Sequence, residues 1–240
     1  MRGSHTRFAM GTDGGAGDQR TACVIGATGA TGRHLVRLLC EHDLYSLVIA
    51  VSRGGLPDDV LGGIDATKVG KLEERKVKDV EEPGDSLRGA NDVFCAIGTQ
   101  RRKAGSWQEF VRIDRDCVAA VAKAAKEAGA SSFSLVTAQG ATLRVPAWKW
   151  KIFHPLLYLR TKGEAEACVT KEFGDNSAIW RPGLLARGAL ARGIEKGWWA
   201  RLADPLSVED LAKAMIAKAA ASQGGIFEGN KEIRSIAESS

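Results

Sequence analysis

Apolar runs and longer amphipathic segments alternate along the chain. The apolar runs lack the polar alternation of a half-exposed strand, which is typical of strands covered on both faces of a parallel sheet. Six such strands are expected, at residues 22–27, 46–53, 74–80, 91–99, 131–141 and 176–183. The longest helical segments between them are residues 32–42, 106–129 and 157–174. Strands that alternate with helices predict an α/β fold with a doubly wound parallel sheet and right-handed crossovers.

The alternation breaks down in the last quarter of the chain. Residues 207–221 are predicted to form a helix that is capped by Ser207, with Asp210 as an acidic variant of the capping box. We expect one domain over residues 21–240. Within it, about 183–240 would form a small C-terminal lobe that acts as a substrate lid over the carboxyl ends of the strands.

The composition is that of a soluble globular protein, with 44% hydrophobic and 26% charged residues. Residues 1–20 have no apolar core, which indicates a disordered leader or a tag remnant. No apolar run approaches the ~20 residues that span a bilayer. The net charge of +5 suits an anionic ligand but is too small to indicate nucleic acid. We therefore expect no transmembrane segment and no nucleic-acid partner.

The five cysteines are scattered and include no C-x-x-C pair. Their odd number and their apolar or helical surroundings predict reduced thiols and a cytoplasmic protein. The four histidines show no metal-ligand spacing with these cysteines, so we expect no metal site.

Three glycines, Gly26, Gly29 and Gly32, lie at three-residue spacing between the first strand and the first helix. Such a turn lets the backbone approach a pyrophosphate, and the helix N-terminus offers N–H groups to the phosphates. The alternative is a tight turn that binds no ligand. This alternative explains the glycines poorly, because three glycines weaken the start of the helix. Although the spacing is G-x-x-G-x-x-G rather than G-x-G-x-x-G, the context predicts a dinucleotide site on a Rossmann fold.

The end of the second strand bears on the choice of nucleotide. A protein that selects NAD usually places a carboxylate there to bind the ribose 2′-hydroxyl. This chain has Ser52 and Arg53 instead, with no carboxylate before Asp58. A guanidinium can hold a 2′-phosphate by charge-assisted hydrogen bonds, although a solvated surface charge is the plainer interpretation. We predict NADP(H) as the cofactor.

Two weaker signals fit the same ligand. Asp79 and Val80 follow the third strand, where an adenine could be met, and the fourth strand has a mostly small carboxyl end over which a ribose or nicotinamide could pass. Ordinary strand ends have similar sequences, so neither signal decides alone. The residues at the end of the fourth strand are Ala96, Ile97, Gly98 and Thr99.

Tyr158 and Lys162 lie four residues apart, on one face of a predicted helix. An ammonium beside a phenol favours the phenolate, which suits a tyrosine to proton transfer. The lysine could also hydrogen-bond the nicotinamide ribose. The Y-x-x-x-K spacing is weak alone and gains weight downstream of the glycine-rich turn.

Taken together, these stretches resemble the short-chain dehydrogenase/reductase superfamily, and within it an atypical branch. The matching stretches, GATGATGRHLV, IGTQRRKAGSWQEFVRIDRDCV, SFSLVTAQGA, YLRTKGEAEA and RPGLL, span roughly residues 22–187. The resemblance implies an NADPH-binding Rossmann fold, with Tyr158 as the proton-transfer tyrosine and Lys162 as the ribose-binding lysine. It also implies that the phosphate turn is lined by Gly26, Thr28, Gly29, Ala30, Thr31 and Gly32, that Arg53 holds the 2′-phosphate, and that Pro182 and Leu184 or Leu185 meet the carboxamide.

The sequence departs from the superfamily pattern at the end of the fifth strand. A serine or threonine there normally hydrogen-bonds the substrate carbonyl, and this chain has Thr137 followed by Ala138 where the resembled proteins have two serines. Thr137 is the candidate for this role if the catalytic hydroxyl belongs to the first position or if the strand end twists to suit; if it belongs to the second position, Ala138 has lost it. Loss of such a donor costs about 10²- to 10³-fold in rate, so the departure bears on turnover and not on cofactor binding.

Two functions are therefore compatible with the sequence. The first is an NADPH-dependent oxidoreductase that reduces an unknown carbonyl substrate, and the second is an NADPH-binding regulatory or scaffold protein with protein partners and little turnover. The basic aromatic loop 144–153 could wall the substrate pocket, lie at a subunit interface, stack bases or meet a membrane surface. Residues 197–202 are expected in the same lid. The basic segment 101–103 could reach a cofactor phosphate or an anionic substrate, or lie in solvent.

Overall fold

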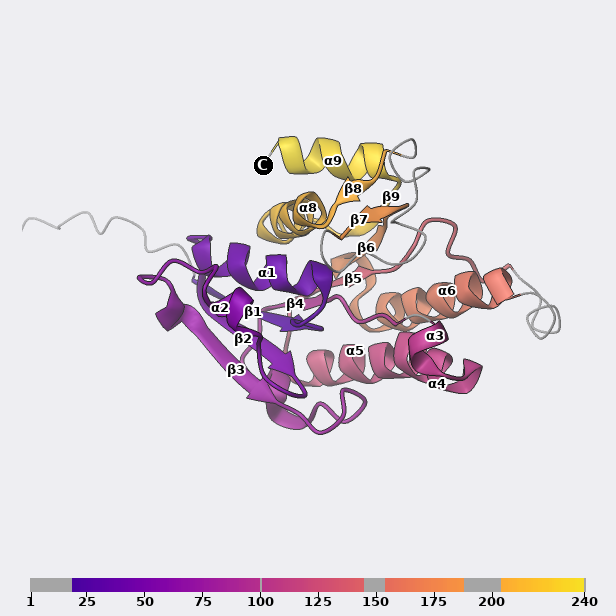
Figure 1. The fold of residues 1–240 in the computed structure, drawn as a ribbon, viewed down its shortest axis with the longest axis horizontal. Helices are drawn as coiled ribbons and strands as arrows, with labels where there is room; N and C mark the ends of the chain where they lie inside the picture. Colours follow the sequence, from indigo (N-terminus) through magenta and orange to yellow (C-terminus); the bar gives the residue numbers. More distant parts are fainter. Residues whose placement is uncertain (1–18, 100, 145–153, 188–203, 240) are drawn as a thin grey trace, which may run out of the picture.

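The computed structural model describes residues 19–99, 101–144, 154–187 and 204–239. Seven parallel strands form one sheet in the order β3-β2-β1-β4-β5-β6-β9 (Figure 1). The first six strands have the order of a Rossmann sheet, with the switch point between β1 and β4. The strands are β1 (Arg20–Ile25), β2 (Tyr45–Ser52), β3 (Leu72–Lys76), β4 (Asp92–Cys95), β5 (Ser132–Val136), β6 (Ser177–Arg181) and β9 (Gly225–Glu228). The predicted doubly wound α/β fold is confirmed.

Helices cover both faces of this sheet (Figure 1). On one face α1 packs against α8, and on the other α5 packs against α6. Short 3₁₀ turns span Val69–Lys71, Gly84–Leu87 and Gly174–Asn176. The α-helices are α1 (Ala30–Glu41), α2 (Asp58–Leu61), α3 (Arg101–Ala104), α4 (Trp107–Val111), α5 (Cys117–Glu127), α6 (His154–Phe173), α8 (Val208–Ala220) and α9 (Asn230–Glu238). Among these helices, none is long and apolar enough to cross a membrane.

Each face of the sheet has its own hydrophobic core. Leu35 and Leu39 of α1 and Met215 of α8 are fully buried on one face, where Trp180 of β6 stacks on Phe227 of β9 with ring centroids 4.4 Å apart. The opposite core combines small and branched residues of α5, α6 and the strands with Phe133 of β5 and Phe173 of α6, whose ring centroids are 5.2 Å apart. Burial on both faces explains the nearly continuous apolar runs.

Two of the expected elements have other bounds in the structure. The single helix expected over 106–129 is divided by a π-helical turn, Arg112–Asp116, between α4 and α5. The strand expected at 74–80 is β3, Leu72–Lys76, which lies at the sheet edge where its charged side chains reach solvent. An edge strand that consists mainly of charged, exposed or half-buried residues has no apolar run to mark its bounds.

The C-terminal part of the chain contributes to the main sheet. Helix α8 packs on α1, and β9 pairs in parallel with β6, while β7 (Leu185–Ala186) and β8 (Leu206–Ser207) form a separate pair. The predicted cap is confirmed, because the hydroxyl of Ser207 accepts from the backbone N–H groups of Glu209 and Asp210 at 3.1 and 3.0 Å.

Candidate functional site

Two cavities, of about 250 and 220 Å³, lie at the carboxyl ends of the strands. Both are lined by the turn after β1 and by the end of β4, so they form one continuous groove across the switch point of the sheet. Open α/β sheets bind ligands at this place. The residues that the two cavities share are Thr28, Gly29, Ala96, Ile97, Gly98 and Thr99.

The glycine turn has no room for side chains at two positions. Gly26 has a φ of +83°, and a Cβ there would lie 2.9 Å from the backbone carbonyl atoms of Ala96. A Cβ at Gly32 would collide with the carbonyl oxygen of Gly26, so α1 packs tightly onto the turn. The N-terminus of α1 at Gly29 has no side-chain cap and no acidic residue in its first turn. These features fit a pyrophosphate lying against the turn.

The smaller cavity lies at the end of β2 and is lined by Ser52, Arg53, Asp79 and Val80. The Ser52 hydroxyl accepts from the backbone N–H of Gly55 at 2.9 Å, and the Arg53 side chain is exposed. The sequence thus brings the predicted 2′-phosphate and adenine residues around one cavity.

Arg112, from the π-helical turn, lines this cavity too and was not predicted. Its guanidinium binds Asp79 at 3.1 Å, Glu81 at 2.8 Å and Glu109 at 2.8 and 3.0 Å. A hydrogen bond from the Glu81 backbone N–H, with the Arg112 charge, holds the pKa of Asp79 below its usual range. Asp79 is thus a carboxylate whose charge a neighbouring cation offsets.

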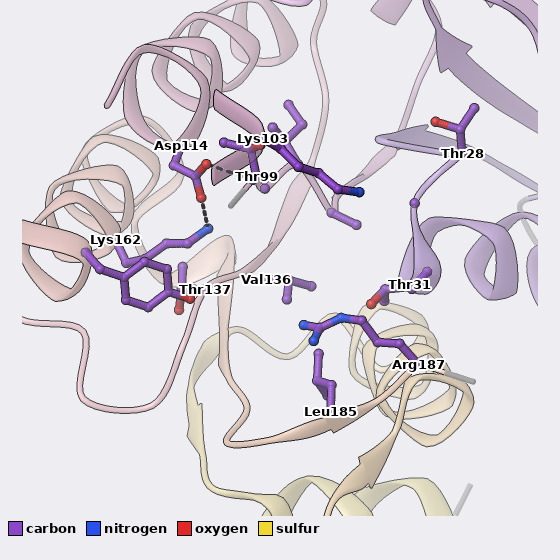
Figure 2. Close-up of a pocket in the computed structure, with 16 residues that line it drawn as sticks. Thr28, Thr31, Thr99, Lys103, Asp114, Val136, Thr137, Lys162, Leu185 and Arg187 are labelled. Atoms are coloured by element: carbon purple, nitrogen blue, oxygen red, sulfur yellow. Dashed lines mark hydrogen bonds and ion pairs between the residues drawn. The ribbon is translucent and has the colours of Figure 1, made fainter. Parts of the chain in front are cut away.

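The larger cavity contains the predicted tyrosine and lysine and a third group, Asp114. The Lys162 Nζ lies 2.7 Å from Asp114 Oδ1, and Asp114 Oδ2 accepts from the backbone N–H of Thr99 at 2.9 Å (Figure 2). Burial opposes the charged ammonium, but the charges of Asp114 and Tyr158 outweigh it, and the pKa of Lys162 is raised. Lys162 is therefore a buried cation with a fixed position.

Tyr158 lies one turn before Lys162 on α6 and lines the same cavity. Its ring packs against the ring of buried Phe110 of α4, with centroids 5.8 Å apart. Packing of the ring and the four-residue spacing place the phenol beside the lysine, as the sequence predicts.

Thr137 lines the larger cavity, but its hydroxyl is hydrogen-bonded to two groups that do not line this cavity. Thr137 Oγ1 lies 2.7 Å from Glu166 Oε1 and 3.1 Å from the backbone oxygen of Trp180. Glu166 is buried and ion-paired with Arg181 at 2.6 Å, and Arg181 also pairs with Glu228 at 3.1 Å. Both neighbours of the hydroxyl are acceptors, so its one proton is directed to them.

Most of the predicted cofactor residues line the groove, and a few do not. Leu185 lines the larger cavity, whereas Pro182, Leu184 and Gly32 line neither. Gly32 lies beneath the phosphate turn, and the Pro182 backbone oxygen accepts from Gln139 N–H at 2.9 Å. The segments 145–153 and 197–202 lie outside the described residues.

Sequence reasoning missed Asp114, Glu166 and Arg112. Asp114 and Arg112 are in a π-helical turn, which helical periodicity cannot reveal. Glu166 could have been found, because it lies four residues after Lys162 and continues the face that carries Tyr158.

Comparison with known proteins agrees with this geometry. A family described as NAD(P)H-binding matches residues 26–222. Protein HTATIP2 of Rattus norvegicus is 33% identical over 69% of this chain, a match that spans 63% of that protein. The mitochondrial protein FMP52 of Candida albicans is 31% identical over 80% of this chain and 85% of its own length.

Solved structures support the fold. The structure of MoeE5 in complex with UDP-glucuronic acid and NAD has a TM-score of 0.65 at 19% identity, over 88% of this chain and 76% of its own length. At this identity the likeness shows the fold alone.

The comparisons also correct one expectation. Several fungal relatives are named as mitochondrial FMP52 proteins. The cytoplasmic location expected from the cysteine pattern is therefore contradicted, because reduced thiols do not distinguish the cytosol from other reducing compartments. The resemblance to the short-chain dehydrogenase/reductase superfamily is confirmed. The chain belongs to the NAD(P)H-binding family, with a Rossmann fold and a nicotinamide dinucleotide as its class of cofactor.

Proposed function

We propose that the protein is an NADPH-dependent oxidoreductase that reduces a carbonyl group. The observation that carries this proposal is that Tyr158 and the Lys162–Asp114 ion pair line one groove with the glycine turn. A proton donor and a dinucleotide would therefore meet in one space. A bound nicotinamide supplies a hydride at its C4 atom.

Four residues of the larger cavity have a proposed task. Tyr158 donates a proton to the oxygen of the carbonyl as that oxygen gains charge. The cation of Lys162 stabilises the phenolate that remains, and Asp114 holds the ammonium in position. Thr137 can orient the substrate oxygen only if its proton leaves Glu166 and Trp180.

We propose NADPH rather than NADH because of the smaller cavity. Arg53 is exposed at the end of β2, and the ion pairs among the described residues include none with its guanidinium. Ser52 and Arg53 can both donate to a 2′-phosphate. Asp79, whose charge is offset by Arg112, can accept from the adenine amino group.

The test has a binding part and a catalytic part. Tryptophan fluorescence is titrated with NADPH and with NADH, and tighter binding of NADPH is expected; equal affinities contradict the choice of cofactor. A panel of aldehydes and ketones is then assayed with the wild type and with Tyr158→Phe. We expect the variant to lose about 10²- to 10⁴-fold in rate, and equal rates would rule out Tyr158 as the proton donor.

A second function is favoured by the Thr137 hydroxyl. Because its proton is directed to Glu166 and Ala138 carries no hydroxyl, the site would be slow, and an NADPH-binding regulatory protein is the alternative. NADPH binding without turnover of any carbonyl in the panel would favour it. By analogy with the FMP52 relatives we also propose a mitochondrial location, which fractionation of cells that express the chain tests.

A further inference from the structure

One wall of the larger cavity is formed by β7, which does not belong to the main sheet. Leu185 of β7 is buried and lines this cavity, and Figure 2 shows its side chain pointing toward Val136 at the end of β5. The strand has two residues and pairs with the two residues of β8, with Leu185 opposite Leu206. A strand pair of this length is not stable alone, so the position of Leu185 depends on further contacts.

The first residue of α9, Asn230, supplies such contacts. Its side-chain Oδ1 accepts from the backbone N–H of Gly183 at 2.9 Å, and its Nδ2 donates to the backbone oxygens of Leu184 at 3.0 Å and Asp204 at 3.1 Å. Both directions of the amide are thereby used, which fixes its orientation. The Leu184 oxygen also accepts from the backbone N–H of Leu206 at 2.9 Å. One side chain therefore joins the residues before β7 to the residues before β8.

The sheet brings Asn230 to this place. Strand β9 pairs with β6 so that Glu228 lies opposite Arg181, and the backbone N–H of Gly229 donates to the Arg181 oxygen at 3.0 Å. The start of α9 thus lies beside the segment that leaves β6. A Cβ at Gly183 would lie 3.3 Å from Asn230 Oδ1, so the glycine permits the close approach of the amide.

A second residue on the same side of α9 holds the same segment. Arg234, one turn after Asn230, binds the Asp204 carboxylate at 2.7 and 2.9 Å and the Pro205 backbone oxygen at 3.3 Å. Asp204 has a φ of +43°, a conformation that residues other than glycine rarely adopt. Ile233, between the two polar residues, is fully buried. Helix α9 therefore fixes a strained turn just before β8.

We propose that Asn230 is a positioning residue for the groove, because it holds β7 where Leu185 packs against the nicotinamide end of the bound dinucleotide. This inference rests on the proposed function, which places the nicotinamide in the larger cavity. Asn230 lines neither cavity, so it acts through β7. Loss of its amide releases Gly183 and Leu184 together, and the wall at Leu185 moves away from the ring.

The test compares two ligands that share an adenosine 2′-phosphate. Calorimetry of the full chain measures the Kd of NADPH, which extends into the larger cavity, and of adenosine 2′-monophosphate, which lacks the nicotinamide. In Asn230→Ala we expect NADPH to bind about tenfold more weakly and adenosine 2′-monophosphate to bind within about twofold of the wild type. Equal losses for the two ligands, or no loss for either, would overturn the proposal. If the wild type prefers NADH, NADH and adenosine 5′-diphosphate form the pair.

A second substitution keeps the test open if Asn230→Ala does not fold. Asn230→Asp retains the acceptor for the Gly183 N–H and loses the donor to Leu184 and Asp204, so it should show the same selective loss. An unchanged circular dichroism spectrum is required of each variant that is compared. Wild-type affinity for NADPH in a folded Asn230→Asp protein would count against the positioning role.

A double-mutant cycle shows whether Asn230 acts through β7. Leu185→Val shortens the cavity wall by one methylene and should weaken NADPH binding about fourfold. Once Asn230→Ala has displaced the wall, the same change should weaken binding by less than about 1.5-fold, because coupled residues are not additive. Additive losses would refute the action of Asn230 through Leu185.

Ser177→Ala is the matched control for stability. Ser177 is buried at the amino end of β6, and its hydroxyl donates to the Gly174 backbone oxygen at 2.6 Å. The variant loses a hydrogen bond at the end of the strand that is far from Asn230. We expect it to unfold at a lower urea concentration while the ratio of the two affinities stays as in the wild type. A ratio changed as in Asn230→Ala would show general loosening instead of positioning.

The two proposals fail in different ways. If the wild type binds NADPH and the folded Asn230 variants keep its ratio of affinities, the positioning role is refuted and the proposed function stands. If the selective loss is found but no carbonyl in the panel is reduced, the positioning role is supported and the reductase is refuted. If the wild type binds neither pyridine nucleotide, both proposals are refuted.

Discussion

The hydroxyl of Thr137 and the carboxylate of Glu166 are 2.7 Å apart, on the side of β5 that faces α6. Glu166 is fixed by Arg181, and Arg181 by Glu228, so a chain of charged groups joins α6, β6 and β9 at the end of the sheet. Thr137 is the member of this network that reaches the groove. Its hydroxyl is therefore bonded as a structural group, at the end of the strand where the resemblance to the superfamily led us to expect a catalytic one.

Replacement of Thr137 separates these roles. Thr137→Val keeps the shape of the side chain and leaves the buried Glu166 with one hydrogen bond fewer, so we expect the free energy of unfolding to fall by about 1–3 kcal/mol. The rate of carbonyl reduction should change by less than about tenfold, because the proton is not aimed at substrate. Urea unfolding and the carbonyl assay measure the two effects. A rate loss of 10²-fold or more with little change in stability would instead make Thr137 the oxyanion donor.

The Asp114–Lys162 pair gives a prediction about pH. The pKa of Lys162 is raised in the folded protein above about 10.4. The stability gained from the pair is thus complete below that pH and is lost as the pH rises through the folded value. In Asp114→Asn, burial of the ammonium is no longer offset, so we expect a lowered pKa and a loss of about 3–5 kcal/mol at neutral pH.

Thermal unfolding between pH 7 and 11 checks this expectation. The wild type should lose stability toward alkaline pH more steeply than Asp114→Asn, and the variant should lose activity at a lower pH than the wild type. Glu164→Gln, which removes a partly exposed carboxylate elsewhere on α6, is the control. Parallel pH curves for the wild type and Asp114→Asn would show that the pair does not set the charge of Lys162.

The parts of the fold that the sequence predicts depend on local pattern. The buried strands, the turn at Gly26 and the Tyr158–Lys162 spacing are each encoded within about ten residues. The parts it does not predict depend on distant contacts. Asp114 reaches Lys162 because a π-helical turn rotates it toward α6. Arg181 bridges Glu166 to Glu228, and Glu228 lies 47 residues after Arg181 in the sequence. Strand β9 has exposed residues and gains its place by pairing with β6.

Arg53 should determine the choice between the two pyridine nucleotides. Arg53→Glu places a carboxylate at the end of β2, where it repels a 2′-phosphate and can accept from a 2′-hydroxyl. We expect NADPH affinity to fall about 100-fold or more and NADH affinity to stay within a few fold. Fluorescence titration measures both. Arg88→Glu, at an exposed position outside both cavities, controls for the change in net charge. Equal losses for the two nucleotides would mean that Arg53 does not contact the 2′ position.

The glycine turn gives the sharpest comparison, because the chain also contains a glycine, Gly54, that has neither the crowded surroundings nor the positive φ of Gly26. Gly26→Ala must place a Cβ 2.9 Å from the Ala96 backbone at a φ of +83°, and we expect a loss of about 1–3 kcal/mol or more in stability, with NADPH binding abolished. Gly54→Ala adds a Cβ with no heavy atom within 4 Å and should leave both properties unchanged. Urea unfolding and calorimetry measure stability and binding on the same samples. If Gly26→Ala bound NADPH as the wild type does, the backbone of this turn would not lie against the pyrophosphate, since the bare backbone is what the phosphates require.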